Sequence, residues 1–141
     1  MKTFYVVALL FWTLPAQAQN QLGSVNISSL LDLNAILITE VDVIIVYDPV
    51  LAENLPANQG DWYRGKYKLL EMGSEKIEVI TVSAPQGFVS DFARLPPRHA
   101  EAVRVLVSAY HETNGVALHD ITAYQRARVE IDSYGILVSG N

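Results

Sequence analysis

The three histidines His99, His111 and His119 are the first residues to consider for chemistry, because histidine is a common metal ligand and titrates near neutral pH. Asp120 adjoins the last of them, but no two histidines stand at the i, i+4 spacing that would place them on one helix face. All three fall in segments that we expect to be loops or strand ends. This spacing favours surface histidines over a metal centre, and we predict neither a metal ion nor a cofactor.

The sequence offers little for nucleophilic catalysis. The chain has no cysteine and no Gly-x-Ser-x-Gly elbow, so no activated nucleophile can be named. Asp48 and Glu53 could form a carboxylate pair of the kind found in glycosidases, but a strand-end cap and a solvated surface residue is the stronger interpretation. We predict no enzymatic activity. A small exported hydrolase that depends on His111 or His119 is the weakest alternative.

An aromatic pair is the more informative feature. Trp62 and Tyr63 lie beside Asp61 and Arg64, and Trp, Tyr and Arg dominate the energetics of protein interfaces. The pair could therefore anchor a protein partner. The alternative is that Trp62 belongs to the core, since a Trp on the apolar face of a covering helix is usually buried, and this alternative is favoured.

The N-terminus resembles a secretory signal peptide in all three of its regions. Lys2 supplies the positive charge, residues 4–14 form an apolar stretch, and Ala16-Gln17-Ala18 is a small-x-small cleavage site. Pro15 interrupts the apolar stretch, which is shorter than the roughly 20 residues of a membrane span. We predict cleavage after Ala18, with residues 1–18 as the signal peptide and 19–141 as one exported domain.

The charge balance excludes one class of partner. Lys2 is the only charged residue of the predicted signal, so the mature chain keeps nine Lys and Arg against 15 Asp and Glu, a net charge of −6. A protein that tracks the phosphates of a nucleic acid should be basic, and we predict no nucleic-acid binding. The absence of cysteine also excludes disulfides, which leaves stability to the apolar core.

The elements that must position these residues are mainly strands. Valines alternate with Arg104 and Ser108 over 103–110, which predicts a central and mostly buried strand. The run at 41–47 turns from alternation to continuous apolar residues, which indicates a strand covered on both faces for part of its length. Further strands are predicted at 25–36, 76–83, 88–95, 126–132 and 136–138, the last two as a hairpin.

One helix interrupts this series. Tyr63, Tyr67 and Leu70 are spaced for one face of a helix over 62–72, with Asp61 as its N-cap and Gly73 at its end. About seven short strands at even spacing with one helical insertion predict an all-β fold, a β-sandwich, in a single domain.

Several of these pieces together resemble TssJ, the outer-membrane subunit of the bacterial type VI secretion membrane complex. The similar features are Leu31-Asp32-Leu33-Asn34 in the first strand, 43–47 closing on Tyr47, the aromatic helical insertion, and 106–110 ending in Ala109-Tyr110. The resemblance covers most of the mature chain in short, degenerate motifs. It implies a transthyretin-like β-sandwich in the periplasm, with no enzymatic activity.

The resemblance also implies a partner, the periplasmic domain of a large inner-membrane subunit, TssM. Contacts would come from loops at one end of the sandwich, here from Ile38, Thr39 and Glu40 between the first two strands. TssJ proteins are lipoproteins, and this chain departs from them because it has no cysteine to acylate. We therefore expect only indirect association with the membrane.

The sequence thus predicts a non-enzymatic periplasmic adaptor of a type VI-like secretion complex, with Thr39, Glu40, Trp62 and Tyr63 as partner-binding residues. The alternative is a secreted or pilus-accessory β-sandwich that works as a binding module.

Overall fold

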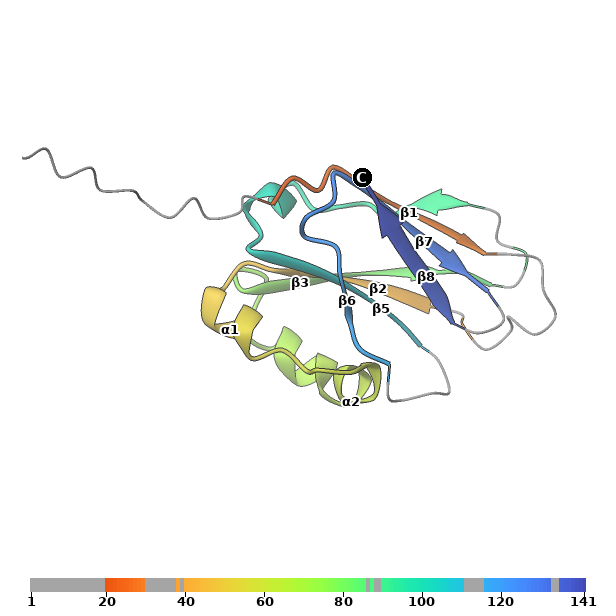
Figure 1. Cartoon of the computed structure of the whole chain (residues 1–141). Helices are drawn as coiled ribbons and strands as arrows, with labels where there is room; N and C mark the ends of the chain where they lie inside the picture. The colour runs from red at the N-terminus through yellow and green to blue at the C-terminus, as the bar shows by residue number, and fades with distance from the viewer. Residues whose placement is uncertain are drawn as a thin grey trace, which may run out of the picture.

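The computed structural model describes residues 20–29, 38, 40–85, 87, 90–110, 116–132 and 135–141. Two four-stranded sheets face each other, and two helices lie against the outer side of one of them (Figure 1). The predicted β-sandwich with a short helical insertion is confirmed. The predicted signal peptide, with Ala16 and Ala18, lies outside the described residues.

The first sheet, sheet A, has the strand order β4-β1-β7-β8. These strands are β4 (Asp91–Phe92), β1 (Ser24–Ser29), β7 (Arg126–Ile131) and β8 (Ile136–Gly140). β1 runs parallel to β7, while the other neighbours are antiparallel. The predicted C-terminal hairpin is therefore confirmed as the β7–β8 pair.

The second sheet, sheet B, is antiparallel throughout and has the order β3-β2-β5-β6. Its strands are β3 (Ile77–Ser83), β2 (Glu40–Val46), β5 (Arg104–Ala109) and β6 (His119–Asp120). The strands predicted at 41–47, 76–83 and 103–110 match to within one residue. β5 has neighbours on both sides and is almost wholly buried, as its alternating valines predicted.

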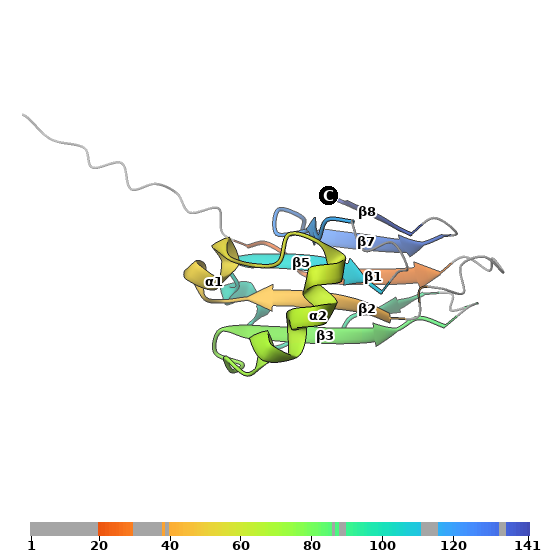
Figure 2. The same cartoon turned by 90° about the horizontal axis from the view of Figure 1, so that it is seen from below.

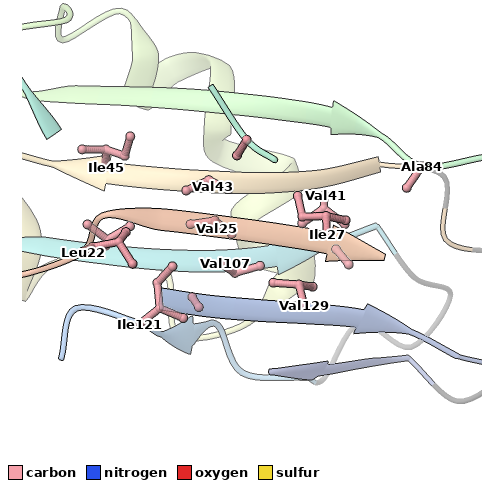
Figure 3. Close-up of a cluster of buried hydrophobic side chains, with 14 of the residues drawn as sticks. Leu22, Val25, Ile27, Val41, Val43, Ile45, Ala84, Val107, Ile121 and Val129 are labelled. Carbon is pink, nitrogen blue, oxygen red and sulfur yellow. The ribbon is translucent and has the colours of Figure 1, made fainter. Parts of the chain in front are cut away.

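The main core fills the space between the sheets. In Figure 3, side chains from alternate positions of facing strands, such as Val25 and Ile27 of β1 and Val41, Val43 and Ile45 of β2, point into one layer. Successive residues of a strand point to opposite faces, so the residues between these belong to the outer faces of the sheets.

A second apolar layer lies on the outer face of sheet B. Helices α1 (Pro49–Glu53) and α2 (Gln59–Leu70) cross this face, as Figure 2 shows from below. They bury Ile44 and Val46 of β2 together with Leu106 of β5. Because β2 lies between the core and the helices, six of its seven residues are buried, which explains the continuous apolar run in its sequence.

The helical insertion begins earlier than predicted. The N-cap of α2 is Asn58, whose Oδ1 accepts a hydrogen bond from the backbone N–H of Asp61 at 2.9 Å, so Asp61 lies in the first turn and is not the cap. Gly73 follows the helix at φ 96°, a conformation that favours glycine, and its N–H donates to the carbonyl of Leu70. The short helix α1 was not predicted, although its N-cap, Asp48, was named as a capping residue.

Two strand predictions were too long or reach beyond the described chain. β1 ends at Ser29, and residues 30–36 of the predicted strand 25–36 lie outside the described residues. Of the predicted strand 88–95, the structure describes residues 90–95, and within them only Asp91–Phe92 form a strand, β4.

Candidate functional site

The four residues predicted to bind a partner have different positions. Glu40 begins β2 and is exposed, and Tyr63 lies in the second turn of α2 with its ring partly buried. Trp62 is 0 % exposed and belongs to the layer between α2 and sheet B, so the core interpretation of this residue describes its place. Thr39 lies outside the described residues.

Beneath Trp62 is a buried polar cluster that connects α2 to sheet B. Asp42, on the outer face of β2, accepts hydrogen bonds through Oδ2 from Trp62 Nε1 at 3.0 Å and from Lys66 Nζ at 2.9 Å. Its Oδ1 accepts from the Thr81 hydroxyl of β3 at 2.7 Å. Asp42, Lys66, Trp62 and Thr81 are called the Asp42 cluster below.

The Asp42 cluster satisfies a carboxylate that is fully buried. A buried charge is tolerated only when it is paired and hydrogen-bonded, and here both carboxylate oxygens accept hydrogen bonds, from two donors on α2 and one on β3. Since Trp62 and Lys66 are four residues apart on α2, the cluster fixes the rotation of the helix over the sheet. The helix face that carries Tyr63 is fixed with it.

An exposed group of aromatic side chains lies next to the Asp42 cluster. Tyr63 and Tyr110 meet edge to face, with ring centroids 5.3 Å apart, and the Tyr110 N–H donates to the Glu40 carbonyl at 3.1 Å. Lys66 Nζ lies 5.5 Å from the Tyr63 ring centroid and 5.6 Å from that of Tyr67. Glu40, Tyr63, Tyr67 and Tyr110 are called the tyrosine surface below.

The tyrosine surface is open to solvent, with Tyr67 74 % and Tyr110 55 % exposed. Tyr63 is more enclosed: burial, followed by the nearby negative charge of Asp42, raises the pKa of its hydroxyl well above the usual range. The Tyr63 hydroxyl is therefore protonated at neutral pH and donates to the Ser108 carbonyl at 3.4 Å. A neutral phenol of this kind can donate a hydrogen bond but does not act as a general base.

The other residues considered for chemistry lie apart. Asp48 caps the first turn of α1 and Glu53 is the last residue of that helix. His99 Nδ1 lies 2.9 Å from the Pro96 carbonyl, and His111 is outside the described residues. Within the described part of the chain, no group of three or more His, Asp or Glu residues could hold a metal ion.

His119 lines a small cavity of about 30 Å³ at the edge of sheet B, together with Ser108 and Gln59. The buried atoms Ser108 Oγ and His119 Nε2 have no hydrogen-bond partner. Burial lowers the pKa of His119. The cavity is large enough for a water molecule but too small for a substrate.

Comparisons with protein-family models, with curated proteins and with solved structures gave no match. None of the described helices is long and apolar enough to cross a membrane. The functional argument therefore depends on the residues of this chain.

Sequence reasoning missed most of the site. Asp42 and Lys66 are 24 positions apart, and nothing in their local sequence pairs them. One signal was available: Asp42 is the single charge inside an otherwise apolar strand, and a charge there must find a partner if the strand is covered on both faces. Tyr110 was noted only as part of a family motif, and its contact with Tyr63 depends on the fold.

Proposed function

We propose that this chain is an exported, non-enzymatic adaptor that binds another protein through the tyrosine surface, and that it serves a type VI-like secretion complex in the manner of TssJ. The tyrosine surface carries the proposal. Tyr side chains supply large contact areas at low entropic cost and are enriched among interface residues that dominate binding energy. Here two exposed rings stand beside a third that the fold holds in place.

The way the surface is built supports a binding role. An interface anchor is effective when its geometry exists before the partner arrives, because less side-chain freedom is lost on binding. Tyr63 is held by Ser108 and by the edge of the Tyr110 ring, and Lys66 is held by Asp42. The rings of Tyr67 and Tyr110 therefore surround a prearranged centre.

The partner that the TssJ resemblance implies is the periplasmic domain of a TssM-like inner-membrane subunit. Glu40, at the rim of the tyrosine surface, adds one negative charge that a basic side chain of such a partner would complement. The missing cysteine makes this partner the route by which the chain reaches the envelope, in place of a lipid anchor. Residue Thr39, which precedes Glu40, is part of the same proposed contact.

The test is an affinity pull-down of the tagged mature domain, residues 19–141, from periplasm and solubilised envelope, with mass spectrometry of the bound proteins. We expect a large inner-membrane secretion subunit to bind the native domain, and the double variant Tyr67→Ala/Tyr110→Ala to lose it. Both tyrosines are exposed, so the variant should fold.

Phe92→Ala is the matched control, because Phe92 is an equally exposed aromatic residue (60 %) on the other sheet. Equal loss of the partner in Phe92→Ala would argue against the tyrosine surface. Recovery of no specific envelope protein by the native domain would overturn the adaptor proposal. The protein should also be found in the periplasm with Gln19 at its N-terminus, and its accumulation in the culture medium would favour a secreted binding module.

A further inference from the structure

A second hollow among the described residues lies on the opposite side of the molecule from the tyrosine surface. It is a groove of about 590 Å³ on the outer face of sheet A, a volume in the range of ligand sites. Both helices lie beyond sheet B and leave this face free of helical cover (Figure 1). This hollow is called the arginine groove, and its lining includes Asn26, Ser90, Phe92, Arg126, Arg128 and Ser139.

The charge of the groove contrasts with that of the chain. Arg126 and Arg128 are alternate residues of β7, so their side chains share the outer face, and both are exposed. Neither forms an ion pair with any residue that the structure describes. Their cross-strand neighbours in β1 are Ser24 and Asn26, which are uncharged. A protein of net charge −5 thus carries two adjacent guanidinium groups, unpaired among the described residues, in this groove.

The remaining lining consists mainly of amide, hydroxyl and aromatic side chains, together with Ala127 and Gly140. Phe92, Asn26, Arg128 and Ser139 are register neighbours on four successive strands, so they form one row across the whole sheet. At about 4.8 Å between strands, the row is roughly 14 Å long. Asn26 is oriented by a hydrogen bond from its Nδ2 to the Ser90 hydroxyl at 2.8 Å, and the Phe92 ring is 60 % exposed at the end of the row.

We propose that the arginine groove binds an acidic oligosaccharide, a chain of sugar units that carries carboxylates. Guanidinium groups bind carboxylates through two parallel hydrogen bonds, and the amide and hydroxyl side chains can exchange hydrogen bonds with sugar hydroxyls. Phe92 offers a flat apolar surface for a sugar ring. The length of the row suits an oligomer better than a single sugar.

The position of the groove argues against an acidic peptide as the ligand. Peptides that bind sheets gain much of their affinity from main-chain hydrogen bonds at a free strand edge. The centre of the groove, with both arginines, lies over β1 and β7, which have neighbours on both sides, so their main-chain groups are engaged in the sheet. Over these two strands only side chains are available, and these match a ligand rich in hydroxyl groups. This inference does not depend on the proposed adaptor function.

The test is isothermal titration calorimetry of the mature domain with three probes: an oligomer of galacturonate, a neutral galactose oligomer of the same length, and polyglutamate. We expect the galacturonate oligomer to bind, the neutral oligomer to bind at least about tenfold more weakly, and polyglutamate to bind no better than the neutral oligomer. Arg126→Gln/Arg128→Gln should weaken galacturonate binding by about tenfold or more, and Phe92→Ala should weaken it as well.

The control is Lys68→Gln/Arg94→Gln, which also removes two positive charges but from exposed positions outside the groove. This variant should keep the native affinity. Equal weakening in both double variants would mean non-specific electrostatic attraction and would overturn the proposal. The proposal would also be overturned if polyglutamate bound more strongly than the neutral oligomer, or if the galacturonate oligomer did not bind. The calorimetry tests the arginine groove independently of the pull-down, because success or failure of the pull-down through the tyrosine surface does not change any of these expected results.

Discussion

The outer faces of the two sheets carry charged residues in the same alternating sequence pattern, but one of these faces is buried and the other is exposed to solvent. Asp42 stands between Val41 and Val43 in β2, and Arg128 stands between Ala127 and Val129 in β7. In both strands the apolar neighbours enter the core and the charged residue points outward. Asp42 is nevertheless fully buried under α2, whereas Arg128 lies in an open groove. Whether helices cover the outer face of a sheet, and not the alternation within the strand, therefore decides whether a charged residue on that face is buried or exposed to solvent.

Chain connectivity accounts for the difference. β2 ends at Val46 and β3 begins at Ile77, so about 30 residues join two adjacent antiparallel strands, and the two helices in this connection pack on the outer face of the sheet to which both strands belong. β7 ends at Ile131 and β8 begins at Ile136, so the corresponding connection in sheet A is far too short to cover it. A long insertion buries the outer face of its own sheet, and a tight hairpin leaves it open.

The sharpest test of this comparison is to remove the charge from each face. Asp42→Ala leaves Lys66 without its buried partner and takes the acceptor from Trp62 and Thr81, so we expect a loss of about 3 to 5 kcal/mol in the free energy of unfolding. Arg128→Ala should change it by no more than about 0.5 kcal/mol, because Arg128 is solvated. Urea unfolding of both variants provides the measurement. Similar losses for the two would contradict the comparison.

A second test compares aromatic residues on the two faces. Trp62→Phe keeps a ring in the layer under α2 but removes the N–H that donates to Asp42 and leaves space unfilled, so we expect a loss of about 2 kcal/mol. Phe92→Leu on the open face should stay within about 0.5 kcal/mol of the native protein. The same urea titration measures both. A tolerated Trp62→Phe would mean that the indole N–H contributes little to the cluster.

A third test compares a buried ion pair with an exposed one. A double-mutant cycle of Asp42→Asn and Lys66→Met should give a coupling energy of about 1.5 kcal/mol. The same cycle for the partly exposed pair Arg104–Asp120, with Arg104→Met and Asp120→Asn, should give less than about 1 kcal/mol, because solvent screens it. A larger coupling energy for the exposed pair would contradict the conclusion that the Asp42–Lys66 pair fixes the position of α2 on sheet B.

The strands could be predicted because their signal is local. The apolar run of β2, the alternating valines of β5 and the alternating charges of β7 each report burial on one or both faces within six or seven residues. The two-residue strands β4 and β6 carry no such signal, since two residues contain no period, and only the register with β1 and β5 defines them. The short helix α1 likewise depends on its Asp48 cap and on packing against β2.

The candidate sites were less predictable because they join distant residues. Trp62 was correctly weighed as a core residue on general burial tendency, but its partner Asp42 is 20 positions away. Phe92 and Arg128 lie on opposite sides of Asn26 only because β1 pairs antiparallel with β4 and parallel with β7. A parallel pairing of strands about 100 residues apart leaves no trace in a local pattern, so the arginine groove could not have been inferred.

The smallest expected effect concerns His119, at the edge of sheet B. Burial lowers the pKa of His119 below its usual value of 6.5, and a proton on its buried Nε2 would find no acceptor to donate to among the described residues. Below pH 6.5 the unfolded chain therefore binds more protons than the folded one, so this residue's contribution to stability is intact above that pH and is lost as the pH falls.

Urea unfolding at about pH 7.5 and about pH 5.5 brackets this window, because an unperturbed histidine titrates near pH 6.5. We expect His119→Gln to reduce the loss of stability between the two pH values by more than His99→Gln, the matched substitution in the 3-10 helix His99–Glu101, does. Asp120 does not interfere. Burial raises the pKa of Asp120, but hydrogen bonds from Thr122 and Arg104 lower it more. The contribution of Asp120 to the pH dependence of stability is therefore confined to pH values below its ordinary pKa of 3.8, outside the range of this test. An unchanged pH dependence in His119→Gln would show that the edge of sheet B is as well solvated as the open face of sheet A.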